Sequence, residues 1–202
     1  MSHIVTKYDV YAAWEYDKEE QDLNAASKNG LQLIKGGCFH SKFIKNSNVR
    51  YIYQLDYNTR IDPIRYREIF EEQGWEYINS TFNGWHYFRK PYREDMEEQE
   101  AKIYTDKQSL YEMQNRWMRL IFLVDILYSL MSVLYIMHGI TGAGYSILVE
   151  GIVFGFLAIT VALGLISMKR KRAGKEGGFV IPLQIAFPLS FLILIFIILF
   201  GF

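Results

Sequence analysis

The sequence predicts a soluble α+β domain followed by an α-helical membrane domain with three spans. Charge is segregated: 16 of the 22 Lys and Arg and 19 of the 22 Asp and Glu fall in residues 1–118. Apolar and polar residues alternate in the first 90 residues, and three long apolar runs follow. Because the soluble part is slightly acidic, it lacks the concentrated basic surface of a nucleic-acid-binding protein, and no nucleic acid is expected as a partner.

The predicted spans cover about residues 119–138, 147–168 and 179–202. A helix needs about 20 apolar residues to cross the hydrocarbon core of a bilayer, and each run approaches or exceeds that length. Pro182 and Pro188 remove backbone donors from the third run, which predicts a kink or a late helix start.

The loops predict the orientation in the cell membrane. The link at 139–144 is uncharged, whereas the link between the second and third spans carries five basic residues, and basic loops stay in the cytoplasm. The N-terminus lacks the basic and apolar regions of a signal peptide. We therefore expect a multi-pass protein in contact with lipid, with a cytoplasmic N-terminus and an external C-terminus.

Small residues line one face of the second span, where they permit close helix packing. Two interpretations remain: a homo-oligomer contact, or packing against another span of the same chain, which we favour. The face comprises Gly151, Gly155, Ala158 and Ala162.

A few polar side chains fall inside or at the ends of the spans. Asp125 lies about 9 Å inside the first span, where a carboxylate is costly unless it faces a partner or water. Ser129 follows one turn later on the same face. Glu150 and His138 lie near the outer ends of their spans. These four residues form the candidate intramembrane polar site, with solvation at the interface as the alternative.

Residues 1–91 are predicted to form a cytoplasmic domain with a tandem β-α-β-β repeat of about 44 residues. In the first copy, a strand at 8–12 precedes a helix that begins at Asp17, with Glu20 completing a capping box, and ends at Gly30. In the second, a strand at 49–57 precedes a helix that Asp62 and Pro63 open and Gly74 ends.

The predicted strands suit one antiparallel sheet with two helices on one face. All four tryptophans lie in residues 1–118. We expect the aromatic residues to fill the core, with an aromatic groove for a peptide, lipid or flat ligand as the alternative.

Residues 92–118 are predicted to be a helical linker. Its seven-residue spacing of apolar residues gives only a weak coiled-coil seam, and Thr105 with Gln108 resembles a capping box that would divide it. Arg116 and Trp117 have the character of membrane-interface residues.

No catalytic, metal or cofactor motif is recognisable. Cys38 is the single cysteine, so an intrachain disulfide is excluded. His40 and His86 fall on predicted strands, without carboxylates or cysteines at metal-ligand spacing. The chain is therefore expected not to be an enzyme.

The sequence resembles the bacterial domain of unknown function DUF2812 over residues 5–90. The resemblance rests on NGLQL, YIYQLDY, FEEQGWEY and, most distinctively, GWHYFRK. It implies a cytoplasmic domain that precedes membrane spans, and it supplies no catalytic or ligand-binding residue.

Together these features favour a membrane-anchored sensory or adaptor protein whose cytoplasmic domain binds a protein partner. The alternative is an accessory or immunity protein that acts on a transporter or antimicrobial peptide in the bilayer. A membrane enzyme is the third expectation.

Overall fold

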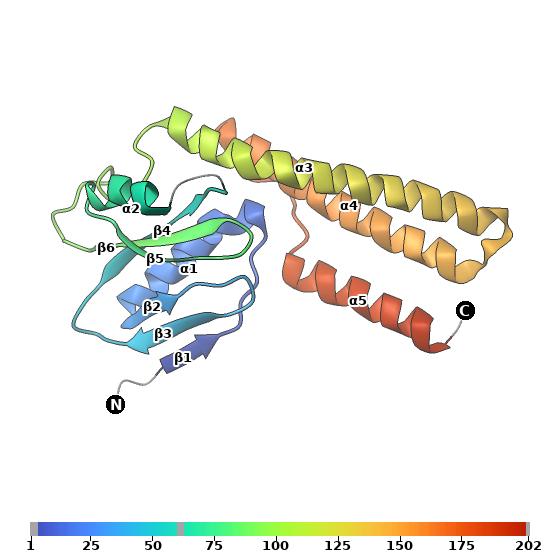
Figure 1. Cartoon of the computed structure of the whole chain (residues 1–202), viewed down its shortest axis with the longest axis horizontal. Helices are drawn as coiled ribbons and strands as arrows, with labels where there is room; N and C mark the ends of the chain where they lie inside the picture. The colour runs from blue at the N-terminus through green and yellow to red at the C-terminus, as the bar shows by residue number, and fades with distance from the viewer. Residues whose placement is uncertain (1–3, 60–62, 201–202) are drawn as a thin grey trace. The chain divides into compact units, whose positions relative to one another are not determined.

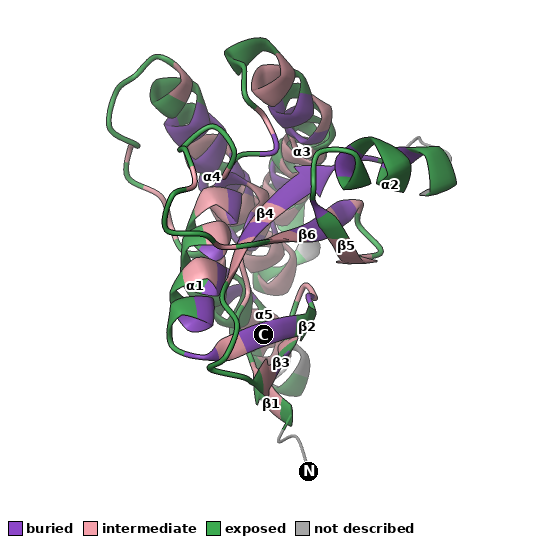
Figure 2. Cartoon of the chain, turned by 90° about the vertical axis from the view of Figure 1, so that its left-hand side faces the viewer, coloured by how far each residue is buried: buried purple, intermediate pink, exposed green. Residues whose placement is uncertain are grey.

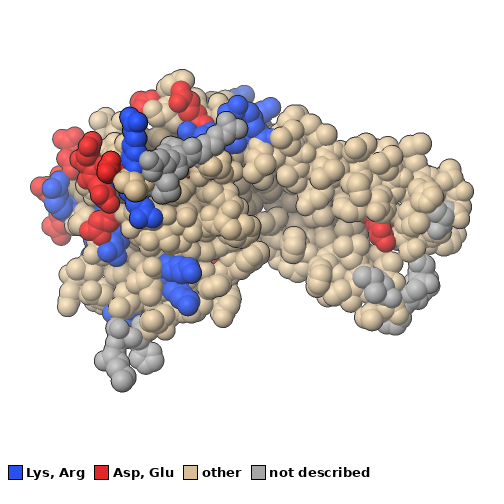
Figure 3. All heavy atoms as spheres, viewed as in Figure 1, with Lys and Arg blue, Asp and Glu red and all other residues tan. Residues whose placement is uncertain are grey.

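The computed structural model describes residues 4–59 and 63–200, and the chain divides into two compact units, Met1–Trp117 and Met118–Phe202 (Figure 1). Charged side chains gather over the first unit, whereas the surface over α4 and α5 is mostly uncharged (Figure 3).

The first unit contains two halves with the same order of elements: strand, helix, strand, strand. The first half comprises β1 (Ile4–Lys7), a short 3-10 helix (Ala13–Glu15), α1 (Tyr16–Lys28), β2 (Leu31–Lys35) and β3 (Ser41–Lys45). The second half comprises β4 (Tyr51–Tyr57), α2 (Pro63–Glu71), β5 (Glu76–Ser80) and β6 (Trp85–Pro91).

Each half forms its own three-stranded antiparallel sheet, in the orders β1-β3-β2 and β4-β6-β5. The expectation of one continuous sheet is therefore corrected to two sheets. A side chain of β5 joins the two sheets at Gly36, the residue after β2: Asn79 accepts a hydrogen bond from the Gly36 N–H at 2.8 Å and donates one to the Gly36 carbonyl at 2.9 Å. An amide side chain thus takes the place of backbone pairing between the sheets.

Helix α1 closes the free edge of β4, where alternate backbone groups would otherwise lack partners. The N–H groups of residues 51, 53 and 55 donate to Ser27 Oγ, Asn24 Oδ1 and Glu20 Oε1 at 2.8, 2.7 and 2.8 Å. The predicted capping box at Asp17 and Glu20 is therefore wrong, because Glu20 bonds to β4. Before α1, the local side-chain hydrogen bond is made by Glu15, whose carboxylate accepts the Ala12 N–H at 3.0 Å.

The remaining boundaries agree in part with the prediction. The strand expected at 8–12 is wrong, because β1 lies at Ile4–Lys7. Pro63 is the first residue of α2, and Asp62 lies outside the described residues. Gly30 and Gly74 have φ angles of +78° and +80°, which confirms the left-handed conformation expected after each helix.

The core of the first unit is aromatic, as the favoured interpretation predicted, and β4 and β6 are its most buried strands (Figure 2). Several of the rings pack edge to face, as Tyr66 does on Phe70 and Phe88, which is an arrangement that the quadrupoles of aromatic rings favour. The buried aromatic residues include Trp14, Tyr16, Tyr53, Tyr57, Tyr66, Phe70, Trp75, Trp85, Tyr87, Phe88 and Trp117.

The predicted linker belongs to this unit. Residues 93–106 form turns and bends without helix, and α3 (Lys107–His138) begins after Asp106, whose Oδ1 accepts the Ser109 N–H at 2.8 Å. Asp106, and not Thr105, is the capping residue. Ile103 and Trp117 are 6% and 1% exposed, so Trp117 is a core residue and its predicted place at the membrane interface is corrected.

The second unit contains the rest of α3, a π-helical turn (Gly139–Ala143), α4 (Tyr145–Arg172) and α5 (Leu183–Phe200). Helices α3 and α4 are long and apolar enough to cross a membrane, and α5 is a shorter apolar helix. The late start of α5, directly after Pro182, is as predicted. Residues 169–172, expected in a loop, form the last turn of α4, where basic side chains suit the negative end of the helix dipole.

The predicted small-residue face of α4 packs against α3 of the same chain. A Cβ added at Gly151 would lie 2.8 Å from the backbone nitrogen of Ile136, and one at Gly155 would lie 2.8 Å from Ser132 Oγ. That hydroxyl donates to the Gly151 carbonyl at 2.8 Å. Ala158 is buried and Ala162 is half-buried. The favoured same-chain packing is therefore what the structure has at these two glycines.

Candidate functional site

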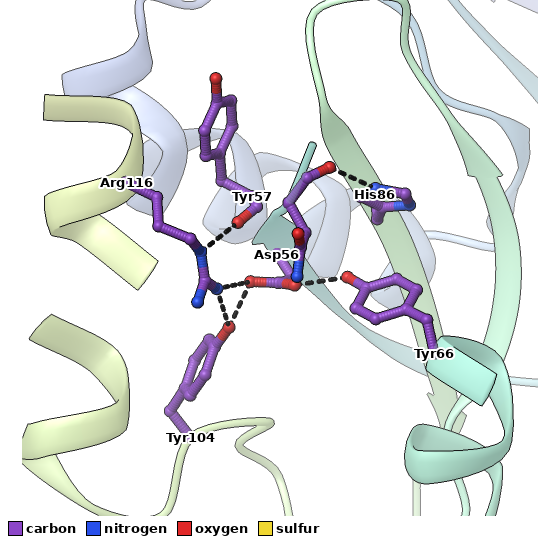
Figure 4. Close-up of polar contacts among 7 residues, drawn as sticks. Asp56, Tyr57, Tyr66, His86, Tyr104 and Arg116 are labelled. Carbon is purple, nitrogen blue, oxygen red and sulfur yellow. Dashed lines mark hydrogen bonds and ion pairs between the residues drawn. The ribbon is translucent and has the colours of Figure 1, made fainter. Parts of the chain in front are cut away.

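Asp56 lies on β4 and is only 1% exposed, so its carboxylate is removed from water when the chain folds. A charge at such a position requires partners. Tyr66 of α2 donates its hydroxyl to Oδ2, and Tyr104 donates to Oδ1 (Figure 4). Burial, followed by the charge of Asp56, raises the pKa of both phenols, which keeps them protonated as donors.

Arg116 of α3 supplies the opposite charge. Its Nη2 lies 3.2 Å from Asp56 Oδ1, and its Nε donates to the Tyr57 carbonyl at 2.9 Å. The prediction that Arg116 is an interface cation is therefore corrected. One carboxylate thus connects α2, through Tyr66, with the first three turns of α3, through Arg116 (Figure 4).

Tyr66 also forms part of the wall of a pocket of about 410 Å³ between α2, β5, β6 and the turn that joins those strands. The ring of Tyr66 lies 4.7 Å from that of His86, and the Arg67 guanidinium lies 4.2 Å from the centre of the Tyr77 ring. Phe82, in the turn, is 89% exposed. The volume is at the lower end of the range for small-molecule sites.

His86 was expected to be an ordinary sheet residue, yet it lines this pocket. Its Nε2 lies 2.9 Å from the Asn58 carbonyl, which can only accept, so Nε2 carries the proton. Its Nδ1 is buried and has no hydrogen-bond partner among the described residues.

A second polar cluster lies on α1. Tyr87 donates to Glu19 at 2.6 Å, and Glu20 accepts the Leu55 N–H. Burial raises the pKa of Glu19 to about 7 and that of Glu20 to about 8. This cluster links α1 of the first half to β4 and β6 of the second half, and the raised pKa values predict that stability depends on pH.

The four residues of the predicted intramembrane site are not joined by hydrogen bonds within residues 4–59 and 63–200. Asp125 is half-buried, and its Oδ1 lacks a hydrogen-bond partner there. Glu150 is half-buried, whereas Ser129 and His138 are exposed. This site stays a prediction. In the same part of the chain, no group of three or more His, Cys, Asp and Glu side chains is placed to hold a metal ion.

Sequence reasoning missed the pocket and the role of Asp56. A signal was available in YIYQLDY, where a carboxylate lies in a strand of large apolar residues and needs a buried partner. Arg67 and Tyr77 come from separate elements, and no spacing in the sequence connects them.

A family model described as "Protein of unknown function (DUF2812)" matches residues 15–126, which extends beyond the resemblance at 5–90 into α3. No curated protein and no solved structure matches the chain.

Proposed function

The chain belongs to the DUF2812 family, whose function is unknown, and from this premise we propose that it is a membrane-anchored sensor or adaptor. In this proposal the first unit is cytoplasmic and receives a signal in the pocket beside Tyr66. The signal changes α3 and thereby the binding of a protein partner.

The observation that carries the proposal is the set of three contacts made by the Asp56 carboxylate. One carboxylate oxygen accepts from Tyr66 in the pocket wall, and the other accepts from Tyr104 and Arg116. A ligand that moves Tyr66 must therefore break or redirect a hydrogen bond to a buried charge. Losing a hydrogen bond to a buried charge costs free energy, so Asp56 is expected to move with Tyr66 or to find another donor. Because Arg116 of α3 is bonded to the same carboxylate, a shift of Asp56 also moves Arg116.

We further propose three spans formed by α3, α4 and α5, with the N-terminus inside and the C-terminus outside. The basic residues at the end of α4 support this orientation, because short basic segments stay on the cytoplasmic side. Helix α5 has 18 residues, close to the number needed to cross the bilayer.

Hydrogen exchange measured by mass spectrometry on the full chain in lipid nanodiscs tests the coupling. Tyr66→Phe removes the hydroxyl that reaches Asp56, and we expect faster exchange in residues 107–117. Tyr53→Phe is the matched control, because it removes another buried hydroxyl, which bonds to Gln32 and the Leu33 N–H. Unchanged exchange in 107–117 with Tyr66→Phe, or an equal change with both variants, contradicts the proposal.

The partner is tested by crosslinking and affinity purification from native membranes, with Asp56→Asn as the uncoupled variant. A cytoplasmic protein whose recovery depends on Asp56 supports a sensor or adaptor. Recovery of a transporter that is independent of Asp56 favours the accessory function instead.

A further inference from the structure

The pocket beside Tyr66 carries a positive charge. Of the described residues that line it, Arg67 alone is charged, and it has no carboxylate partner within residues 4–59 and 63–200. Its guanidinium lies over the face of Tyr77 at 4.2 Å. Because a contact with an aromatic ring does not neutralise a guanidinium, its charge and N–H groups remain available for a two-point contact with an anion.

The buried carboxylate that Tyr66 contacts does not cancel this charge. Asp56 lies behind Tyr66 and is already bonded to Tyr66, Tyr104 and Arg116. Its charge is balanced by Arg116, so Asp56 does not pair with Arg67, whose exposed guanidinium is free to contact an anion that enters the pocket.

The other walls combine aromatic rings with small and polar residues, which are Asn58, Thr59, Ser80, Thr81 and Gly84. The ring of His86 contacts those of Tyr66 and Tyr77, with centroids 4.7 and 6.0 Å away, and Phe82 in the turn is exposed. Flat rings bind well between such surfaces. A pocket of about 410 Å³ accommodates a compound with one or two rings.

We propose that this pocket binds a small flat organic anion, whose acid group contacts Arg67 and whose ring packs against Tyr77, His86 and Tyr66. The inference rests on the proposed function, since such an anion would be the signal.

Calorimetry with the full chain in detergent micelles, referenced to empty micelles, tests this proposal. The probes are benzoate and naphthalene-2-carboxylate, each paired with its neutral amide. We expect both acids to bind, and the amides to bind at least about tenfold more weakly, because the charge-assisted contact is lost. Acids that do not bind at millimolar concentration, or amides that bind equally well, overturn the proposal.

Two arginine variants locate the charge. Arg67→Gln is expected to weaken benzoate binding at least about tenfold. Arg65→Gln is the matched control: Arg65 is exposed on the same helix and does not line the pocket. Equal loss in both variants, or normal binding by Arg67→Gln, overturns the assignment. Binding of inorganic phosphate or cyclohexanecarboxylate as tight as that of benzoate overturns the requirement for a flat ring.

Calorimetry and the hydrogen-exchange measurement together separate this inference from the proposed function. If benzoate binds through Arg67 but leaves hydrogen exchange in residues 107–117 unchanged, the ligand class stands and the sensor function fails. If Tyr66→Phe alters that exchange while neither acid binds, the ligand class fails and the coupling stands.

Discussion

Arg116 and Asp56 are 60 residues apart in the chain, yet Arg116 Nη2 lies 3.2 Å from Asp56 Oδ1. The pair fastens the beginning of α3 to β4. Because Asp56 is 1% exposed while the Arg116 side chain is about one-third exposed, the carboxylate depends on protein partners more than the guanidinium does.

We therefore expect Asp56→Asn to destabilise the first unit by about 2–4 kcal/mol, since it removes the charge that Arg116 and two tyrosine hydroxyls bind. Tyr104→Phe, which removes one hydroxyl, should cost about 1 kcal/mol. All four tryptophans lie in this unit, so tryptophan fluorescence during urea unfolding reports on it alone. A cost for Asp56→Asn below that of Tyr104→Phe would contradict the assigned role.

Two glycines after β2 and α2 are expected to differ in their response to alanine. Gly74 has a φ angle of +80°. An added Cβ would lie 3.4 Å from Lys90 Cε, which is an ordinary van der Waals contact. Backbone strain alone should therefore make Gly74→Ala less stable by about 1 kcal/mol. A Cβ on Gly36 would lie 2.5 Å from the ring of Tyr87, which is 3% exposed. We expect Gly36→Ala to cost about 3 kcal/mol or more.

The same fluorescence measurement checks both variants. Gly74→Val is also predicted to cost more than about 1 kcal/mol. Gly74→Asn is the control, because asparagine tolerates the left-handed conformation. The explanation for Gly36 fails if Gly36→Ala unfolds at the urea concentration of the wild type.

The pH dependence of stability follows from the two glutamates of α1. Their pKa values in the folded state, about 7 for Glu19 and about 8 for Glu20, lie above the ordinary value of 4.5 because of burial. Between pH 4.5 and 8 the unfolded chain releases protons that the folded chain retains. Stability therefore falls as pH rises through this window and levels off above it.

Glu20→Gln removes this charge and keeps an oxygen for the Leu55 N–H. We expect it to raise stability by a few kcal/mol at pH 8 and to change it little at pH 5. Glu68→Gln, on the exposed face of α2, is the control. Equal effects of Glu20→Gln at the two pH values would show that Glu20 titrates in its ordinary range.

Local patterns in the sequence predicted local structure, and long-range contacts account for the failures. Glycines in a left-handed conformation and the strands YIYQLDY and GWHYFRK were found because their signals are local. Glu20 has the spacing of a capping box, but its carboxylate accepts the N–H of Leu55, 35 residues away, in place of a backbone N–H at the start of α1. Trp117 likewise has the character of an interface residue, and only the folded unit reveals its buried place.

The pocket depends even more on long-range contacts that sequence patterns do not predict. Tyr66 and Arg67 come from α2, Tyr77 from β5 and His86 from β6, and their proximity depends on the pairing of β5 with β6. The register places Ser80 opposite His86, and Tyr77 opposite Phe88. The repeat predicted the order of these elements, but not which side chains would converge.

The proposed orientation predicts which positions are accessible from outside the cell. In a Cys38→Ser background, a cysteine at Lys175 should resist a membrane-impermeant maleimide in intact cells and react after permeabilisation. A cysteine added after Phe202 should react in intact cells. Labelling of position 175 in intact cells would reverse the orientation, and protection of both positions would contradict a third span.

Two polar residues of α3 are expected to have opposite effects on stability when they are substituted. Ser132 donates to the Gly151 carbonyl, whereas Asp125 Oδ1 has no hydrogen-bond partner in the described part of the chain. In an apolar environment a bonded hydroxyl stabilises helix packing by about 1 kcal/mol, but an unpartnered carboxylate is costly. We expect Ser132→Ala to destabilise the second unit in micelles and Asp125→Leu to stabilise it, both measured by helical circular dichroism during unfolding in SDS.

Asp125→Asn separates structure from function, because asparagine keeps the shape and removes the charge. If a partner outside the chain binds this carboxylate, both Asp125→Asn and Asp125→Leu should lower the recovery of crosslinked complexes from native membranes, although neither unfolds the chain. Ser132→Ala serves as the control for a general loss of packing. Wild-type recovery of complexes with Asp125→Leu would remove Asp125 from the signalling element and leave it as a solvated interfacial side chain.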